Sequence, residues 1–133
     1  MNNIKYGYEK NLADVSLDDA RARVVEALAA EGFGVLTEID VKATLKKKLD
    51  VDFRRYVILG ACNPKLAHRA LEAEPQIGLM LPCNVVLQES DDGVILSIAN
   101  PRILFGLVEN SALDSLAGEA DERLRRVLES VNG

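Results

Sequence analysis

Several features that would assign a function directly are missing from this sequence. No apolar run is long enough to span a membrane, and the first residues lack the apolar stretch of an export signal. No C-x-x-C pair, Walker loop or dinucleotide-binding glycine pattern is present. From these absences we expect a soluble, cytoplasmic protein with no membrane partner, whose two cysteines stay reduced.

Histidine and basic charge are also scarce. His68 is the only histidine, so a catalytic site built on histidine has one candidate, and no serine has an evident base partner. The net charge is −5, which argues against a phosphate-binding surface, and we therefore expect no nucleic-acid partner. One local exception is a basic stretch, which we interpret as a solvated helix face: Lys42, Lys46, Lys47, Lys48, Arg54 and Arg55.

The composition itself is that of an ordinary globular protein. Of the 133 residues, 48% are apolar and 28% are charged, and no polar, biased segment or linker divides the chain. A chain of this length fits one domain, so we expect residues 1–133 to form a single domain with its own core.

The apolar pattern predicts alternating strands and helices. Alternating or continuous apolar runs predict strands at 4–9, 33–39, 54–60, 77–89 and 94–99, with Pro82 causing a bulge or marking an edge strand. Helical spacing predicts helices from Ser16 to Gly32, at 41–49, at 64–73 and at 114–131. The sequence Asp91-Asp92-Gly93 predicts a hairpin turn, and residues 102–110 follow no clean period. One antiparallel sheet with helices on one face is the α+β fold that best accommodates this order.

Three blocks of sequence carry a resemblance to a known family. They are Gly-Phe-Gly-Val-Leu-Thr-Glu-Ile-Asp at 32–40, Tyr-Val-Ile-Leu-Gly-Ala-Cys-Asn-Pro at 56–64, and Glu-Pro-Gln-Ile-Gly-Leu-Met-Leu-Pro-Cys-Asn-Val-Val at 74–86. In this order they resemble the prokaryotic family called domain of unknown function 302, over about residues 4 to 131. The resemblance implies a single curved antiparallel sheet backed by helices, similar to the TATA-box-binding-protein-like class, and a homodimer. It implies no activity, cofactor or catalytic residue, and Asn100 stands where the family often has aspartate.

The two cysteines are the first candidates for chemistry. Cys62 precedes Asn63, the expected cap of the helix that begins at Pro64, so the positive end of the helix dipole would lower the thiol pKa. Cys83 precedes Asn84, and the two Cys-Asn pairs can approach if their strands are neighbours. A redox pair, a persulfide carrier or a soft-metal site would then be possible, with His68 as a third ligand. The alternatives are core packing for the cysteines and a lone surface position for His68; because the spacing matches no zinc motif, we expect no metal site or cofactor.

The apolar segment near residue 105 is the second candidate. Its side chains can line a pocket, form a dimer contact, or simply be buried under the last helix: Ile103, Leu104, Phe105, Leu107 and Val108.

Two functional hypotheses follow from these residues. The favoured one is a non-catalytic module that binds a small apolar ligand or a partner, because a curved sheet leaves a concavity and no catalytic set is assembled. The alternative is a thiol-based redox or soft-metal-binding protein that uses Cys62 and Cys83. A purely structural homodimer subunit is a third possibility, in which the segment at 103–108 forms the contact.

Overall fold

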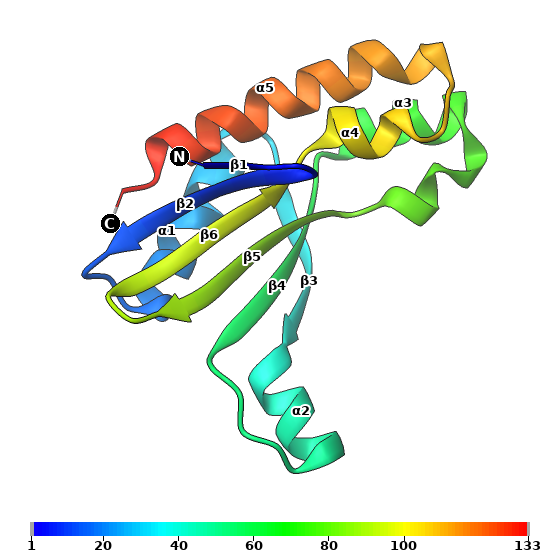
Figure 1. Ribbon diagram of the computed structural model, residues 1–133. Coiled ribbons are helices and arrows are strands. Elements are labelled where there is room, and N and C mark those ends of the chain that lie inside the picture. The colour runs from blue at the N-terminus through cyan, green and yellow to red at the C-terminus, as the bar shows by residue number, and fades with distance from the viewer. Residues whose placement is uncertain (1, 133) are drawn as a thin grey trace.

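The strands form one fully antiparallel sheet in the computed structural model, which describes residues 2–132. The six strands are β1 (Asn2–Ile4), β2 (Gly7–Ala13), β3 (Gly34–Asp40), β4 (Tyr56–Cys62), β5 (Cys83–Ser90) and β6 (Gly93–Ala99). Their spatial order is β1-β2-β6-β5-β4-β3, and every neighbouring pair is antiparallel. The sheet is twisted, and no helix lies in front of β2, β6 and β5 in the view of Figure 1.

The chain also forms helices, and all of those described except the second lie over the other face of this sheet. They are α1 (Leu17–Ala30), α2 (Val41–Leu49), α3 (Pro64–Ala73), α4 (Pro101–Gly106) and α5 (Asp114–Ser130), with short 3-10 helices at Pro75–Met80 and Ser111–Leu113. Figure 1 shows α1 behind the sheet and α5 running along its upper side, with α3 and α4 beside the first half of α5. No helix within residues 2–132 has both the length and the apolar character needed to cross a membrane.

Alternate residues of the central strands face the helices and build the core. Leu59 of β4, Leu87 of β5 and Leu96 of β6 are fully buried, and they belong to the same cluster as Leu28 of α1 and Leu124 of α5. A second, smaller cluster fills the space between α3, α4 and the start of α5. The intervening residues of each strand therefore point to the face of the sheet that carries no helix, which we call the open face.

Short-range sequence signals place the elements as expected. The hydroxyl of Ser16 accepts a hydrogen bond from the backbone N–H of Asp19 at 3.1 Å, and Gly32 has a φ of 84° just after α1. The hairpin at residues 91–92 joins β5 to β6, with Ser90 opposite Gly93. The apolar stripe of α5 is buried as predicted.

Two strand predictions are wrong in detail. The expected strand at 4–9 is divided by a turn at residues 5–6, so Tyr6 is exposed and Tyr8 is buried. The expected strand at 77–89 begins only at Cys83, because residues 75–80 form a 3-10 helix. Pro82 therefore lies before a central strand, where its missing N–H interrupts no ladder, and it causes neither a bulge nor an edge.

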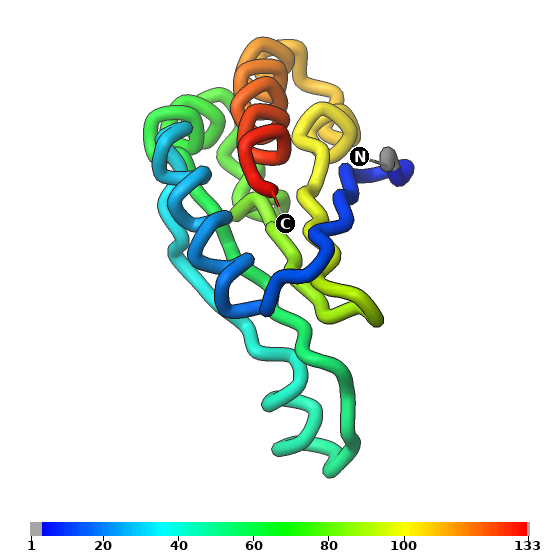
Figure 2. Tube along the Cα trace, turned by 90° about the vertical axis from the view of Figure 1, so that its left-hand side faces the viewer, coloured from blue at the N-terminus to red at the C-terminus, as the bar shows by residue number. Residues whose placement is uncertain are grey.

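Helix α2 lies outside the core of the protein. It projects with the following loop beyond the sheet, as Figures 1 and 2 both show. None of its residues is buried, and its four lysines are exposed as expected for a solvated face. We call residues 41–55 the arm.

Candidate functional site

The structure brings the two cysteines together at one end of the core. Cys62 is the last residue of β4 and Cys83 the first of β5, and Cys83 lies opposite Ala61 in the ladder. Both cysteines line one cavity between the sheet, α3 and α5, together with Asn63, Phe33 and other residues: Ala61, Leu66, Ala67, Ala70, Leu81, Phe105, Leu116 and Ala120. We call this space the cysteine cavity.

The electrostatics of the cysteine cavity oppose thiolate formation. Burial raises the pKa of the half-buried Cys62 thiol above its ordinary value of 9.0. Burial, and secondarily the charge of Cys62, raise the pKa of Cys83 to about 11. The pKa of Cys62 is thus raised and not lowered as expected from its place before α3, because burial removes hydration from the charged form.

The cysteine cavity is also small. Its volume is about 30 Å³, which is room for a water molecule but not for an organic ligand. Its lining is almost entirely apolar apart from Asn63, whose side-chain oxygen already accepts a hydrogen bond from the backbone N–H of Leu66 at 3.3 Å. The space resembles a packing defect between the two core clusters more than a ligand site.

The other residues proposed around the cysteines lie elsewhere. Asn84 follows Cys83 directly, so it points to the open face while Cys83 packs against the core. The side chain of His68 is 75% exposed, and its Nε2 lies 3.5 Å from a carboxylate oxygen of Glu72. Among residues 2–132 no three histidine, cysteine or acidic side chains are grouped to hold a metal, so the idea of His68 as a third ligand is wrong.

The apolar segment at 103–108 divides between core and surface. Phe105 is buried in the second cluster, with Leu104 and Val108 packed against it at half-burial. Ile103 and Leu107 are exposed, at 46% and 69%. Burial under α5 thus accounts for part of the segment, and a homodimer contact through the exposed part stays a prediction.

A hollow lined by both polar and apolar groups lies on the open face of the sheet. Its volume is about 380 Å³. We call it the open-face groove; its lining residues come from the β1–β2 turn and from β2, β4, β5 and β6, namely Ile4, Tyr6, Gly7, Glu9, Tyr56, Asn84, Val86, Gln88, Ser97, Ile98 and Ala99.

Strand register explains how these residues meet. Glu9 lies opposite Ser97, Ser97 opposite Val86, and Val86 opposite Ile58, which makes one row across four strands. Gly7 lies opposite Ala99, and because neither has a bulky side chain, the floor of the groove is deeper there, with Asn84 also in the lining. Sequence analysis missed this site except for Asn84, because the rows depend on pairing between strands far apart in the chain.

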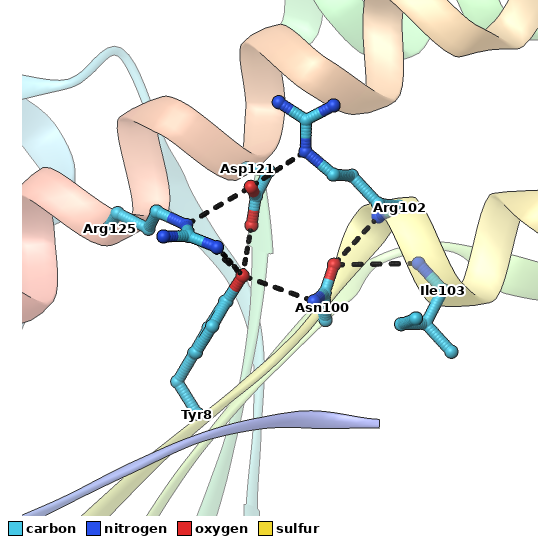
Figure 3. Close-up of polar contacts among 6 residues, drawn as sticks. All are labelled: Tyr8, Asn100, Arg102, Ile103, Asp121 and Arg125. Atoms are coloured by element: carbon cyan, nitrogen blue, oxygen red, sulfur yellow. Dashed lines mark hydrogen bonds and ion pairs between the residues drawn. The ribbon is translucent and has the colours of Figure 1, made fainter. Parts of the chain in front are cut away.

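A buried polar network lies at the junction of β2, α4 and α5 (Figure 3). The Tyr8 hydroxyl donates to Oδ1 of Asp121 at 2.7 Å and accepts from Nη2 of Arg125 at 2.8 Å. Asp121 accepts at Oδ2 from Nε of Arg102 at 2.8 Å and from Nε of Arg125 at 3.2 Å. Asn100 completes the network by donating to the Tyr8 hydroxyl at 3.1 Å.

This network holds elements together and has no free nucleophile. Burial, followed by the hydrogen bond to Asp121, raises the pKa of Tyr8, so its hydroxyl stays protonated at neutral pH. Asn100 also caps α4 through its side-chain oxygen, which accepts from the backbone N–H of Arg102 at 2.9 Å. Only the spacing of Asp121 and Arg125 by four residues hinted at any of these contacts in the sequence.

Comparison with known proteins agrees with the fold. An antiparallel sheet with helices on one face defines an α+β protein of the TATA-box-binding-protein-like class. A model of the family described as Domain of unknown function DUF302 matches residues 8–131, so the chain belongs to that family. The crystal structure of an uncharacterized conserved protein DUF302 from Bacillus stearothermophilus is similar, with a TM-score of 0.88 and 29% identity, covering 97% of this chain and 100% of that chain. No curated protein matches this chain.

Proposed function

We propose that this protein is a non-catalytic binding module and that its ligand is a small molecule held in the open-face groove. The observation that carries the proposal is the size of the groove. Its volume of about 380 Å³ falls in the range typical of small-molecule pockets, about 300–1,000 Å³. The cysteine cavity, at about 30 Å³, is far below that range.

The chemistry of the groove supports the same proposal. Val86 and Ala99 offer apolar contact area, whereas Asn84 and Gln88 offer hydrogen-bonding groups. A few polar groups on an otherwise apolar floor are what orients a small ligand. The ligand proposed here is thus partly polar, in contrast to the purely apolar one expected from the sequence.

Native mass spectrometry of the freshly purified protein, followed by fragment screening with NMR, tests the proposal. We expect bound molecules or fragments to shift the backbone amides of Val86 and Ser97. Ser97→Leu should fill the groove and abolish binding, while Asn11→Leu, on the same face but outside the groove, should leave it intact. Finding no retained molecule and no fragment that shifts these amides would refute the proposal.

A thiol-based function is the second candidate, and one observation favours it. Both sulfur-bearing residues line the same cavity, so a redox or soft-ligand role has its two groups in place. The raised pKa values of Cys62 and Cys83 predict slow alkylation at neutral pH. Rapid alkylation of either thiol in the folded protein near pH 7 would reverse our order of the two candidates.

A further inference from the structure

Glu9 places a negative charge in the open-face groove. It is half-buried in the middle of β2 and lines the groove beside Ser97. Among the residues whose side chains are described, no lysine, arginine or histidine forms an ion pair with it, whereas Glu31 and Glu38 are paired with arginines. The carboxylate is therefore partly shielded from water without a cation to offset its charge.

Two cations near Glu9 or the groove, Lys10 and Arg54, are engaged elsewhere, and the exposed Lys5 of the β1–β2 turn does not line the groove. Lys10, its neighbour, points to the helical face, where its Nζ donates to the backbone oxygens of Leu128 and Val131, each at 2.6 Å. Arg54 donates from Nε to Oε1 of Gln88 at 2.9 Å, and its guanidinium lies 4.5 Å from the ring centroid of Phe53. Arg54 is not a lining residue, so the charge offered by the groove lining is that of Glu9.

Two aromatic rings also line the groove. Tyr6 lies in the β1–β2 turn with 64% of its surface exposed, and Tyr56 begins β4. The face of a tyrosine ring attracts an organic cation, an interaction of about 0.5–1 kcal/mol at exposed sites. The Arg54 guanidinium lies 5.9 Å from the centroid of the Tyr56 ring, so the ring open to a ligand cation is that of Tyr6. The Glu9 carboxylate and the Tyr6 ring are complementary to a positively charged group attached to an apolar body.

We propose that the open-face groove selects small organic cations, with a protonated amine at Glu9 and an apolar or aromatic body over Val86 and Ala99. This inference rests on the proposed binding function and specifies the ligand class. Because Arg54 adjoins the Tyr56 and Gln88 end, the cationic group lies at the Glu9 end of the groove. The Gln88 side-chain nitrogen remains able to donate to a polar atom on the ligand body, since Arg54 occupies only the oxygen.

A set of three probes of matched shape and different charge tests the inference. NMR titration of the full chain would use 2-phenylethylamine as the cation, 2-phenylethanol as the neutral probe and phenylacetate as the anion. We expect the cation to bind about tenfold more tightly than the neutral probe, and the anion not at all. Glu9→Gln should remove the preference, while Glu122→Gln on the exposed surface of α5 should preserve it.

The possible outcomes separate the inference from the proposal on which it rests. If the neutral probe or the anion shifts the groove amides as strongly as the cation does, the charge selection is refuted and the binding module stands. If none of the three probes binds, the proposed ligand class is refuted, while native mass spectrometry and fragment screening decide the binding module separately. Tyr6→Leu provides a second variant, because the exposed ring can be removed without disturbing the core. It should weaken the binding of 2-phenylethylamine more than the binding of 2-phenylethanol.

Discussion

At the scale of single residues, Asp121 is a charged side chain in a buried position, where it needs hydrogen-bond partners for both oxygens. Among the described residues it is the only buried polar or charged side chain, with 1% of its surface exposed. Hydrogen bonds from Tyr8, Arg102 and Arg125 satisfy its two oxygens. Because two half-exposed arginines share this one carboxylate, its removal affects three contacts at once.

We predict that Asp121→Asn lowers the free energy of unfolding by about 2–3 kcal/mol, since the amide cannot accept from all three donors and leaves two arginines unpaired. Urea denaturation measures this loss. Glu119→Gln is the matched control, because it removes an exposed carboxylate paired with Arg123 in the same helix and should cost about 0.5 kcal/mol or less. Equal losses in the two variants would contradict the importance assigned to burial.

At the scale of elements, α2 and α3 begin with the same chemistry but differ in packing. Asp40 caps α2 by accepting from the backbone N–H of Ala43 at 2.9 Å, and Asn63 caps α3 in the equivalent way. Helix α3 buries Leu66 and Ala70 in the second cluster, while α2 buries no residue. The stability of α3 is thus coupled to the core, and that of α2 is mostly local.

This difference predicts unequal effects of removing the two caps. Asn63→Ala should lower the global free energy of unfolding by about 1 kcal/mol, because α3 cannot loosen without exposing core residues. Asp40→Ala should change the global value by less than about 0.5 kcal/mol, while amide hydrogen exchange in α2 accelerates. Urea denaturation and exchange at Ala43 measure the two effects, and a larger global loss from Asp40→Ala would show that the arm is coupled to the core.

At the scale of the whole molecule, burial of Cys83 links stability to pH. Its folded-state pKa of about 11 lies above the ordinary value of 9.0. Between these two pH values the unfolded chain binds fewer protons than the folded protein. The contribution of this thiol to the free energy of unfolding is therefore fully present below pH 9 and is lost as the pH rises toward 11. The contribution lost is on the order of 2–3 kcal/mol, because one pKa unit corresponds to roughly 1.4 kcal/mol.

We therefore predict that the free energy of unfolding decreases between pH 9 and pH 11, and that Cys83→Ala flattens this decrease. The substitution also creates a small void, but that cost is the same at every pH and leaves the slope unaffected. Cys62→Ala should flatten the slope less, because Cys62 is more exposed. Identical slopes for the unaltered chain and Cys83→Ala, measured by urea denaturation at several pH values, would show that this thiol is not held in its protonated form.

The sequence was a good guide to several features that depend on near neighbours, but the turn at residues 5–6 and the start of α4 at Pro101 were missed. Ser16, Gly32, Asn63 and the turn at 91–92 were predicted because caps and turns need only a few adjacent residues. Predictions failed where a continuous apolar run was interpreted as a strand, as at residues 77–80, where a 3-10 helix replaces the expected strand. Tertiary packing overrides local pattern in such segments.

The candidate site was less accessible to prediction. The proximity of Cys62 and Cys83 was anticipated as a possibility, but their protonation follows from how deeply they are buried, which no local pattern reports. Neither Glu9 nor Tyr56 was predicted as a site residue, because nothing in the sequence of a single strand indicates which residues lie opposite it. Only the strand order and register place them in the open-face groove.

The sequence by itself determined the class of this protein: its α+β fold, most of its helix ends, its hairpin and its family. These depend on short-range sterics, hydrogen bonds and hydrophobic period, which are encoded within a few residues. The tertiary structure alone decided which side chains share the open face and which thiol is shielded from water by burial. It also decided that Asp121 of α5 accepts hydrogen bonds from β2 and α4. The reason is that hydration and charge at a site are set by groups brought together from distant parts of the chain.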